Sequence, residues 1–130
     1  MKYTIPEDFK EIVGLINPDS FIADMFEVGE IQNISGDYSR DCKLLCNNST
    51  AWILKKLTDS KYLYEIQIVE GHFDTWEHTW IKAGDYYLDL TLAQFLECPK
   101  IVVSRIGEVK GYIEEKTFTP FEWAKKTREE

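Results

Sequence analysis

Alternating side chains in the second half of the chain constrain its fold more than any other feature. Between residues 62 and 69 every second position is a tyrosine or an isoleucine, the period of two typical of a β-strand. Two more strand patterns, 76–82 and 86–90, are joined by Gly84 and Asp85. A glycine in such a short connection is typical of a β-hairpin. These residues therefore predict an antiparallel meander.

Helical patterns precede these strands. Pro6 begins one that runs to Ile16, a second covers residues 21–29, and a third begins near Cys46. After the meander we expect a short apolar segment at 92–96, strands at 101–104 and 112–118, and a helix at 120–126. Helices followed by an antiparallel meander indicate the α+β class.

Length and composition fit one globular domain covering residues 1–130. The chain has 130 residues, of which 44% are hydrophobic and 14% aromatic. That size matches the usual size of one domain, and the apolar content can supply its core.

Charge and cysteine usage narrow the partners and the compartment. The formal net charge is −8, from 23 acidic and 15 basic residues. This balance repels phosphate backbones and anionic lipid, so we expect no nucleic-acid partner. No apolar run approaches the roughly 20 residues of a membrane span, and the charged start lacks a signal peptide's apolar stretch. We therefore expect a cytoplasmic protein with three reduced cysteines and no membrane contact.

Three residues, in chain order, carry candidate chemistry. Cys46 is expected at a helix N-terminus, where the helix dipole and a nearby imidazole favour the reactive thiolate. His78 lies on one predicted strand and Asp89 on the next. A catalytic imidazole needs a third group to hold its orientation, so these residues predict a Cys46–His78–Asp89 triad.

The spacing of His78 and Asp89 supports this pairing. A tight turn at Gly84 and Asp85 would place the two side chains nearly opposite each other on neighbouring strands. Directly opposed side chains have Cβ atoms about 5 Å apart, which suits an imidazole–carboxylate hydrogen bond.

The sequence contains four short motifs: Cys46-Asn47-Asn48-Ser49, Val69-Glu70-Gly71, Glu77-His78-Thr79-Trp80 and Tyr87-Leu88-Asp89-Leu90-Thr91 with Gln94-Phe95 behind it. Together they resemble the transglutaminase-like and papain-like cysteine enzymes, in particular a bacterial and phage Cys-x-Asn-Ser group. The likeness covers residues 42–95. It implies a nucleophile helix packed on a small antiparallel sheet.

The resemblance also implies roles for single residues. Cys46 would be the nucleophile, His78 the general base and acid, and Asp89 the orienting carboxylate. Trp80, Asn48 and Gln32 are the predicted substrate-binding residues. Trp80 shares a strand face with His78, and Gln32 is a distant candidate for the oxyanion hole. The backbone N–H of Cys46 is the other candidate donor, because the papain-type glutamine motif is missing before Cys46.

Other interpretations of the cysteines remain open. Cys42 lies four residues before Cys46, which would place both on one helix face. It is an alternative nucleophile, or it packs beneath the site. Cys98 is expected to be an incidental free thiol. A buried Cys46 with no catalytic role is a further alternative, because cysteine is among the most buried residue types.

A structural zinc site is a further alternative. Cys42 and Cys46 with His72 and His78 have spacings compatible with a Cys₂His₂ site. The long intervening segment and the unexplained Asp89 argue against it, and His72 is then expected in a solvated loop.

The sequence thus predicts a thiol hydrolase or acyl transferase that needs no cofactor or metal. Its substrate would be a peptide, a protein or a small amide, attacked by Cys46 to give a thioacyl intermediate. The alternatives are a catalytically silent binding or inhibitor module on the same fold, then a structural zinc domain.

Overall fold

The computed structural model describes residues 7–58, 63 and 65–129. Its α-helices are α1 (Glu7–Gly14), α2 (Pro18–Glu27), α3 (Tyr38–Asp41), α4 (Cys46–Lys56) and α5 (Pro120–Glu129), with a short 3₁₀ helix η2 (Leu92–Gln94). Its strands are β1 (Ile66–Phe73), β2 (Trp76–Ala83), β3 (Tyr86–Asp89), β4 (Val102–Arg105) and β5 (Tyr112–Phe118). The predicted α+β class is confirmed.

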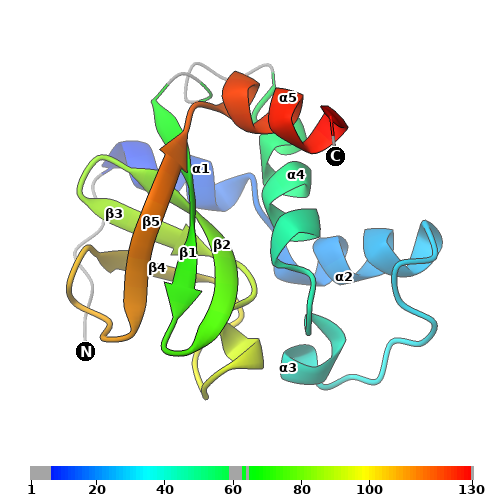
Figure 1. Ribbon diagram of the computed structural model, residues 1–130. Helices are drawn as coiled ribbons and strands as arrows, with labels where there is room; N and C mark the ends of the chain where they lie inside the picture. Colours follow the sequence, from blue (N-terminus) through cyan, green and yellow to red (C-terminus); the bar gives the residue numbers. More distant parts are fainter. Residues whose placement is uncertain (1–6, 59–62, 64, 130) are drawn as a thin grey trace.

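The strands form one antiparallel sheet, and α2, α3 and α4 lie to one side of it (Figure 1). Its strand order is β4-β3-β2-β1-β5, so β1 to β3 form the predicted meander, β4 extends it beside β3, and β5 returns to pair with β1. At the β1–β5 pairing the register shifts between Glu70 and Gly71. A Cβ on Gly71 would lie 1.9 Å from the carbonyl oxygen of Ile113, so only glycine fits this close approach of two strands.

Both hairpins of the meander have two-residue connections. Ala83 pairs with Tyr86 across the predicted Gly84–Asp85 turn, and Gly84 has a φ of 59°. Asp74 in the β1–β2 connection has a φ of 57°. Glycine and aspartate are among the residues that adopt this left-handed conformation most easily.

The helices pack on the sheet and on each other. Helix α4 runs beside the sheet and contacts β2, and α2 lies beyond it (Figure 1). The ring of Trp52 in α4 lies 5.6 Å from that of Phe21 in α2, and its indole N–H donates to Asp24 at 2.8 Å. This contact joins α2 to α4 and helps to fix the helix that begins at Cys46.

Side chains of β2 alternate between two cores. Ile81 belongs to the larger core, which also contains buried residues of α2 and α4. Trp80 joins a smaller cluster with Val69 and Tyr87, against which Tyr112 packs. This alternation is the period of two expected from the sequence.

Several expected boundaries need correction. The first strand was predicted to start at residue 62, but β1 begins at Ile66. Residues 62 and 64 lie outside the described part of the chain. Because β1 extends to Phe73, His72 belongs to a strand, contrary to the predicted solvated loop. Within the described ranges, no helix is long and apolar enough to cross a membrane.

Candidate active site

Cys46 is the first residue of α4, as the sequence indicated. Leu45 precedes it as the N-cap and supplies no side-chain cap. The hydroxyls of Ser49 and Thr50 both donate to the carbonyl oxygen of Cys46 at 2.9 Å. These bonds hold the first turn of α4, and its helix dipole favours a negative charge at this end.

Leu44 separates this helix from the one before it. Its φ of 64° is left-handed, a conformation that is costly for a leucine. Cys42 is the C-cap of α3 and is fully buried. The prediction that Cys42 and Cys46 share one helix face is therefore wrong, because the turn at Leu44 breaks the helical continuity between them.

His78 and Asp89 form a buried hydrogen bond. The Nε2 atom of His78 lies 2.7 Å from Asp89 Oδ2, and both side chains are almost completely buried. The register differs from the expected one, because Ile81 pairs with Leu88. Asp89 is thus offset by two residues from the position opposite His78. An even offset keeps both side chains on the same face of the sheet, so the contact still forms.

Asp89 accepts hydrogen bonds from two further groups besides His78. Its Oδ1 accepts the backbone N–H of Thr91 at 2.9 Å, and its Oδ2 accepts the hydroxyl of Tyr112 at 2.7 Å. Sequence reasoning found Thr91 as part of the strand motif and missed Tyr112, which no motif marks and which lies on β5. The aromatic rings of Trp80 and His78 stack at 5.6 Å. These contacts fix both the carboxylate and the imidazole.

The start of α4 reaches an open edge of β2. Strand β3 pairs with β2 only at Ile81–Ala83, so the neighbouring backbone around Thr79 is left for other partners. A hydrogen bond from the backbone of Thr79 helps to lower the pKa of the Cys46 thiol. The ring nitrogen of His78 that does not bond Asp89, Nδ1, is buried and has no hydrogen-bond partner among the described residues.

Cys46 and His78 shift each other's pKa in opposite directions. Burial raises the pKa of the Cys46 thiol, but the hydrogen bond and charge of His78 outweigh burial and bring this pKa below its ordinary value. Burial likewise lowers the pKa of His78, while the charge and hydrogen bond of Asp89, with a contribution from Cys46, raise it to about 9. Each charge therefore stabilises the other, because the imidazolium of His78 favours the thiolate form of Cys46 and the thiolate favours the imidazolium.

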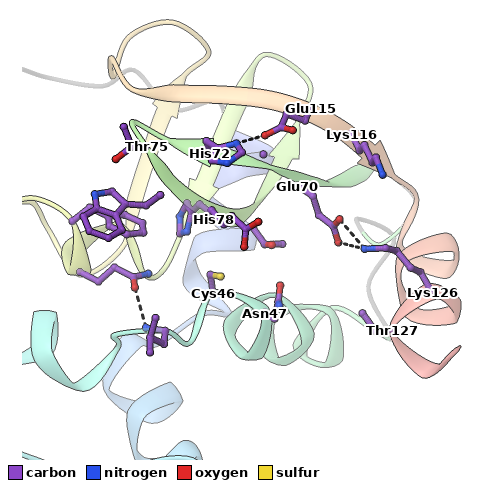
Figure 2. A pocket seen from close by; sticks show the side chains of 17 residues that line it. Cys46, Asn47, Glu70, His72, Thr75, His78, Glu115, Lys116, Lys126 and Thr127 are labelled. Carbon is purple, nitrogen blue, oxygen red and sulfur yellow. Dashed lines mark hydrogen bonds and ion pairs between the residues drawn. The ribbon is translucent and has the colours of Figure 1, made fainter. Parts of the chain in front are cut away.

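A pocket of about 790 Å³ contains both residues, and Figure 2 shows the Cys46 sulfur facing His78 inside it. Charged residues line one side, where Lys126 pairs with Glu70 at 2.8 Å and His72 with Glu115. The other lining residues include Leu44, Asn47, Trp76, Gln94 and Phe95. The nucleophile candidate is thus open to a ligand, whereas His78 and Asp89 lie behind it.

The predicted substrate-binding residues are placed less favourably. Trp80 is 1% exposed and supports the His78 ring from behind, and Trp76, 59% exposed, lines the pocket instead. Asn48 is half-buried and Gln32 is exposed, and neither lines this pocket. The period of two correctly put Trp80 on the face of His78, but it did not show which tryptophan meets solvent.

The other two thiols are poor nucleophiles. Burial raises the pKa of Cys42 to about 12 and that of Cys98 to about 11, in both cases with a contribution from the charge of Asp89. In the part of the chain that the structure describes, no group of three or more His, Cys, Asp or Glu side chains is arranged to hold a metal ion.

Comparisons with protein-family models, with curated proteins and with solved structures find no match to this chain.

Proposed function

We propose that the protein is a cysteine-dependent hydrolase or acyl transferase that acts on an amide or a related acyl bond, on a papain-like or transglutaminase-like core. The observation that carries the proposal is the joint arrangement of Cys46, His78 and Asp89. A thiol with a lowered pKa faces an imidazole whose Nε2 bonds a buried carboxylate and whose Nδ1 is buried without a hydrogen-bond partner among the described residues. Nucleophile, base and orienting group in this order are what thiol catalysis requires.

The proposed reaction has two steps. The Cys46 thiolate attacks the carbonyl carbon, a C–S bond forms, and the carbonyl electron pair moves to oxygen. The tetrahedral intermediate collapses to a thioester, and the imidazolium of His78 gives its proton to the departing amine. Water, or an acceptor amine, then attacks the thioester while His78 takes up its proton, and the C–S bond breaks to release the acyl product and the Cys46 thiolate beside the imidazolium.

The pocket also offers a wall for an acyl group. Leu44 and Trp76 are 81% and 59% exposed and line the space next to Cys46. The Trp76 ring stacks on Phe95 with centroids 6.3 Å apart. Apolar walls of this kind hold a substrate and exclude water from the reacting atoms.

A silent binding module is the second candidate, because the same exposed side chains of Leu44 and Trp76 suit the binding of an apolar ligand without chemistry. Labelling with a thiol-reactive probe separates the two. We expect fast, pH-dependent labelling that is lost in Cys46→Ser and retained in Cys42→Ser and Cys98→Ser. Equally slow labelling of all three cysteines would support the binding module instead.

A further inference from the structure

Gln94 lines the pocket of Cys46 and belongs to none of the interactions that orient His78. Its side-chain Oε1 accepts the backbone N–H of Leu44 at 2.9 Å. Its Nε2 is buried and has no hydrogen-bond partner among the described residues. Burying an N–H donor unpaired costs about 1–3 kcal/mol, and such groups are rare enough to require a reason.

The bond to Leu44 settles which end of the amide is which. A backbone N–H can only donate, so the atom that faces Leu44 must be the oxygen of Gln94. The amino group is therefore the end held away from Leu44. A donor locked in this way needs no reorganisation when an acceptor arrives.

The same short segment carries a second free donor. Cys46 lies two residues after Leu44, and its backbone N–H is at the start of α4, where helix geometry provides no acceptor. Leu45 contributes no side-chain cap there. The chain turns at Leu44, whose φ of 64° is left-handed, and this turn lies between the residue that contacts Gln94 and Cys46.

We infer that Nε2 of Gln94 and the backbone N–H of Cys46 form the oxyanion hole. This rests on the proposed function, in which attack by the thiolate leaves a negative charge on the former carbonyl oxygen. That oxygen would accept both donors and satisfy the buried amino group. Gln32, the glutamine expected from the sequence, is exposed and lies outside the pocket lining.

The test compares two reactions of the same thiol in a Cys98→Ser background. Acylation by p-nitrophenyl acetate passes through an oxyanion and releases p-nitrophenolate. Exchange with a pyridyl disulfide uses the thiolate but forms no oxyanion. Gln94→Glu keeps an oxygen for the Leu44 N–H and removes the donor. Gln94→Met removes both, and Gln32→Glu is the matched control outside the pocket.

We expect both Gln94 variants to lose about 100-fold in the acylation rate, the usual effect of removing one oxyanion donor. Disulfide exchange should stay within about threefold in Gln94→Met, which adds no charge near the thiolate. Gln32→Glu should change neither rate, and thermal melting should show that every variant is folded.

Three results would overturn the assignment. Unchanged acylation in both variants would mean that the amide contacts no oxyanion. An equal fall of acylation and disulfide exchange in Gln94→Met would mean that Gln94 only positions Cys46. A wild-type protein in which Cys46 exchanges no faster than an ordinary thiol would overturn the proposed function itself and this inference with it, and that result is visible before any Gln94 variant is made.

Discussion

The pocket of Cys46 has two walls that are held in different ways. The sheet wall is formed by His78, which lines the pocket, and by Asp89 and Tyr112 behind it; the three lie on three strands and are connected by hydrogen bonds of 2.7 Å. The helix wall consists of Leu44, Cys46 and Gln94, and it depends on one left-handed residue and one bond between a side chain and the backbone.

The two walls should tolerate substitution to different degrees. In the sheet wall, strand register and several partners determine each side chain, so a single substitution leaves buried groups unpaired. In the helix wall, the backbone determines the position of the sulfur and the outer side chains face solvent. We therefore expect substitutions in the sheet wall to lower stability or reactivity, whereas a substitution at Leu44 in the helix wall should raise stability.

Asp89→Asn should give the largest effect on reactivity. The amide keeps an oxygen for the Thr91 N–H but cannot stabilise the imidazolium of His78. Acylation of Cys46 should fall by orders of magnitude, about 10⁴ in the comparable substitution of a serine triad. Labelling and thermal melting measured together check this. A variant that melts early but labels normally, corrected for its folded fraction, would make Asp89 purely structural.

Gly71→Ala should be the most destabilising change in the sheet. The new Cβ would lie 1.9 Å from the Ile113 carbonyl oxygen, so β1 and β5 must separate locally. We expect a loss of about 3 kcal/mol in the free energy of unfolding, measured by denaturant titration. The control is Gly14→Ala, where a Cβ meets nothing within 4 Å. Equal stability of the two variants would contradict the tight β1–β5 contact.

The pH dependence should distinguish the thiols. Burial raises the pKa of Cys98 to about 11, whereas His78 holds that of Cys46 below its ordinary value. At pH 7 Cys46 should therefore label at least about 100-fold faster. Turnover of an amide should fall as the pH rises through about 9, where His78 loses its proton, while labelling of Cys46 should not. Parallel profiles would contradict the ion pair.

Tyr112→Phe should have a smaller effect. It removes one donor from Asp89 and leaves the bonds from His78 and Thr91 in place. We expect a loss of about 1 kcal/mol in stability and a rate of acylation reduced by no more than about tenfold. A fall as large as that of Asp89→Asn would show that Tyr112 is as important to the site as the carboxylate.

Leu44→Gly should act in the opposite direction on stability. Glycine adopts a φ of 64° without the penalty that a leucine has there. The lost side chain is 81% exposed, so little burial disappears. A gain of about 0.5–1 kcal/mol, measured by thermal melting, is expected. Asp74→Gly at the β1–β2 hairpin is the control and should gain less, because aspartate tolerates this conformation. A destabilised Leu44→Gly would show that its side chain packs on the fold.

Much of the sheet wall was predictable because strand patterns have a simple period. The meander, the Gly84–Asp85 turn and the shared face of His78 and Asp89 follow from alternation and turn chemistry. The two-residue error in register did not matter, since an even shift preserves the face. Tyr112 could not be found in this way, because its contact with Asp89 depends on β5 returning to β1, a long-range choice that local patterns do not encode.

The helix wall was harder to predict because it depends on backbone torsion. Nothing in the Cys42–Cys46 spacing signals that Leu44 adopts a left-handed φ, and a leucine is an unfavourable residue for it. The spacing therefore predicted a shared helix face for Cys42 and Cys46, although the helix itself was expected to begin near Cys46, and the sequence marks Gln94 only as part of a motif. Its role depends on an unpaired buried atom, which no sequence displays.

The position of β5 also has a consequence for the order in which the protein takes shape during synthesis. Strands β1 to β4 pair with their neighbours in sequence, so they can assemble as the chain leaves the ribosome. His78 and Asp89 are then present, but the hydroxyl of Tyr112 is not. The nascent meander therefore holds a carboxylate with one of its donors missing until β5 pairs with β1. The set of hydrogen bonds to Asp89 is completed only when that strand arrives.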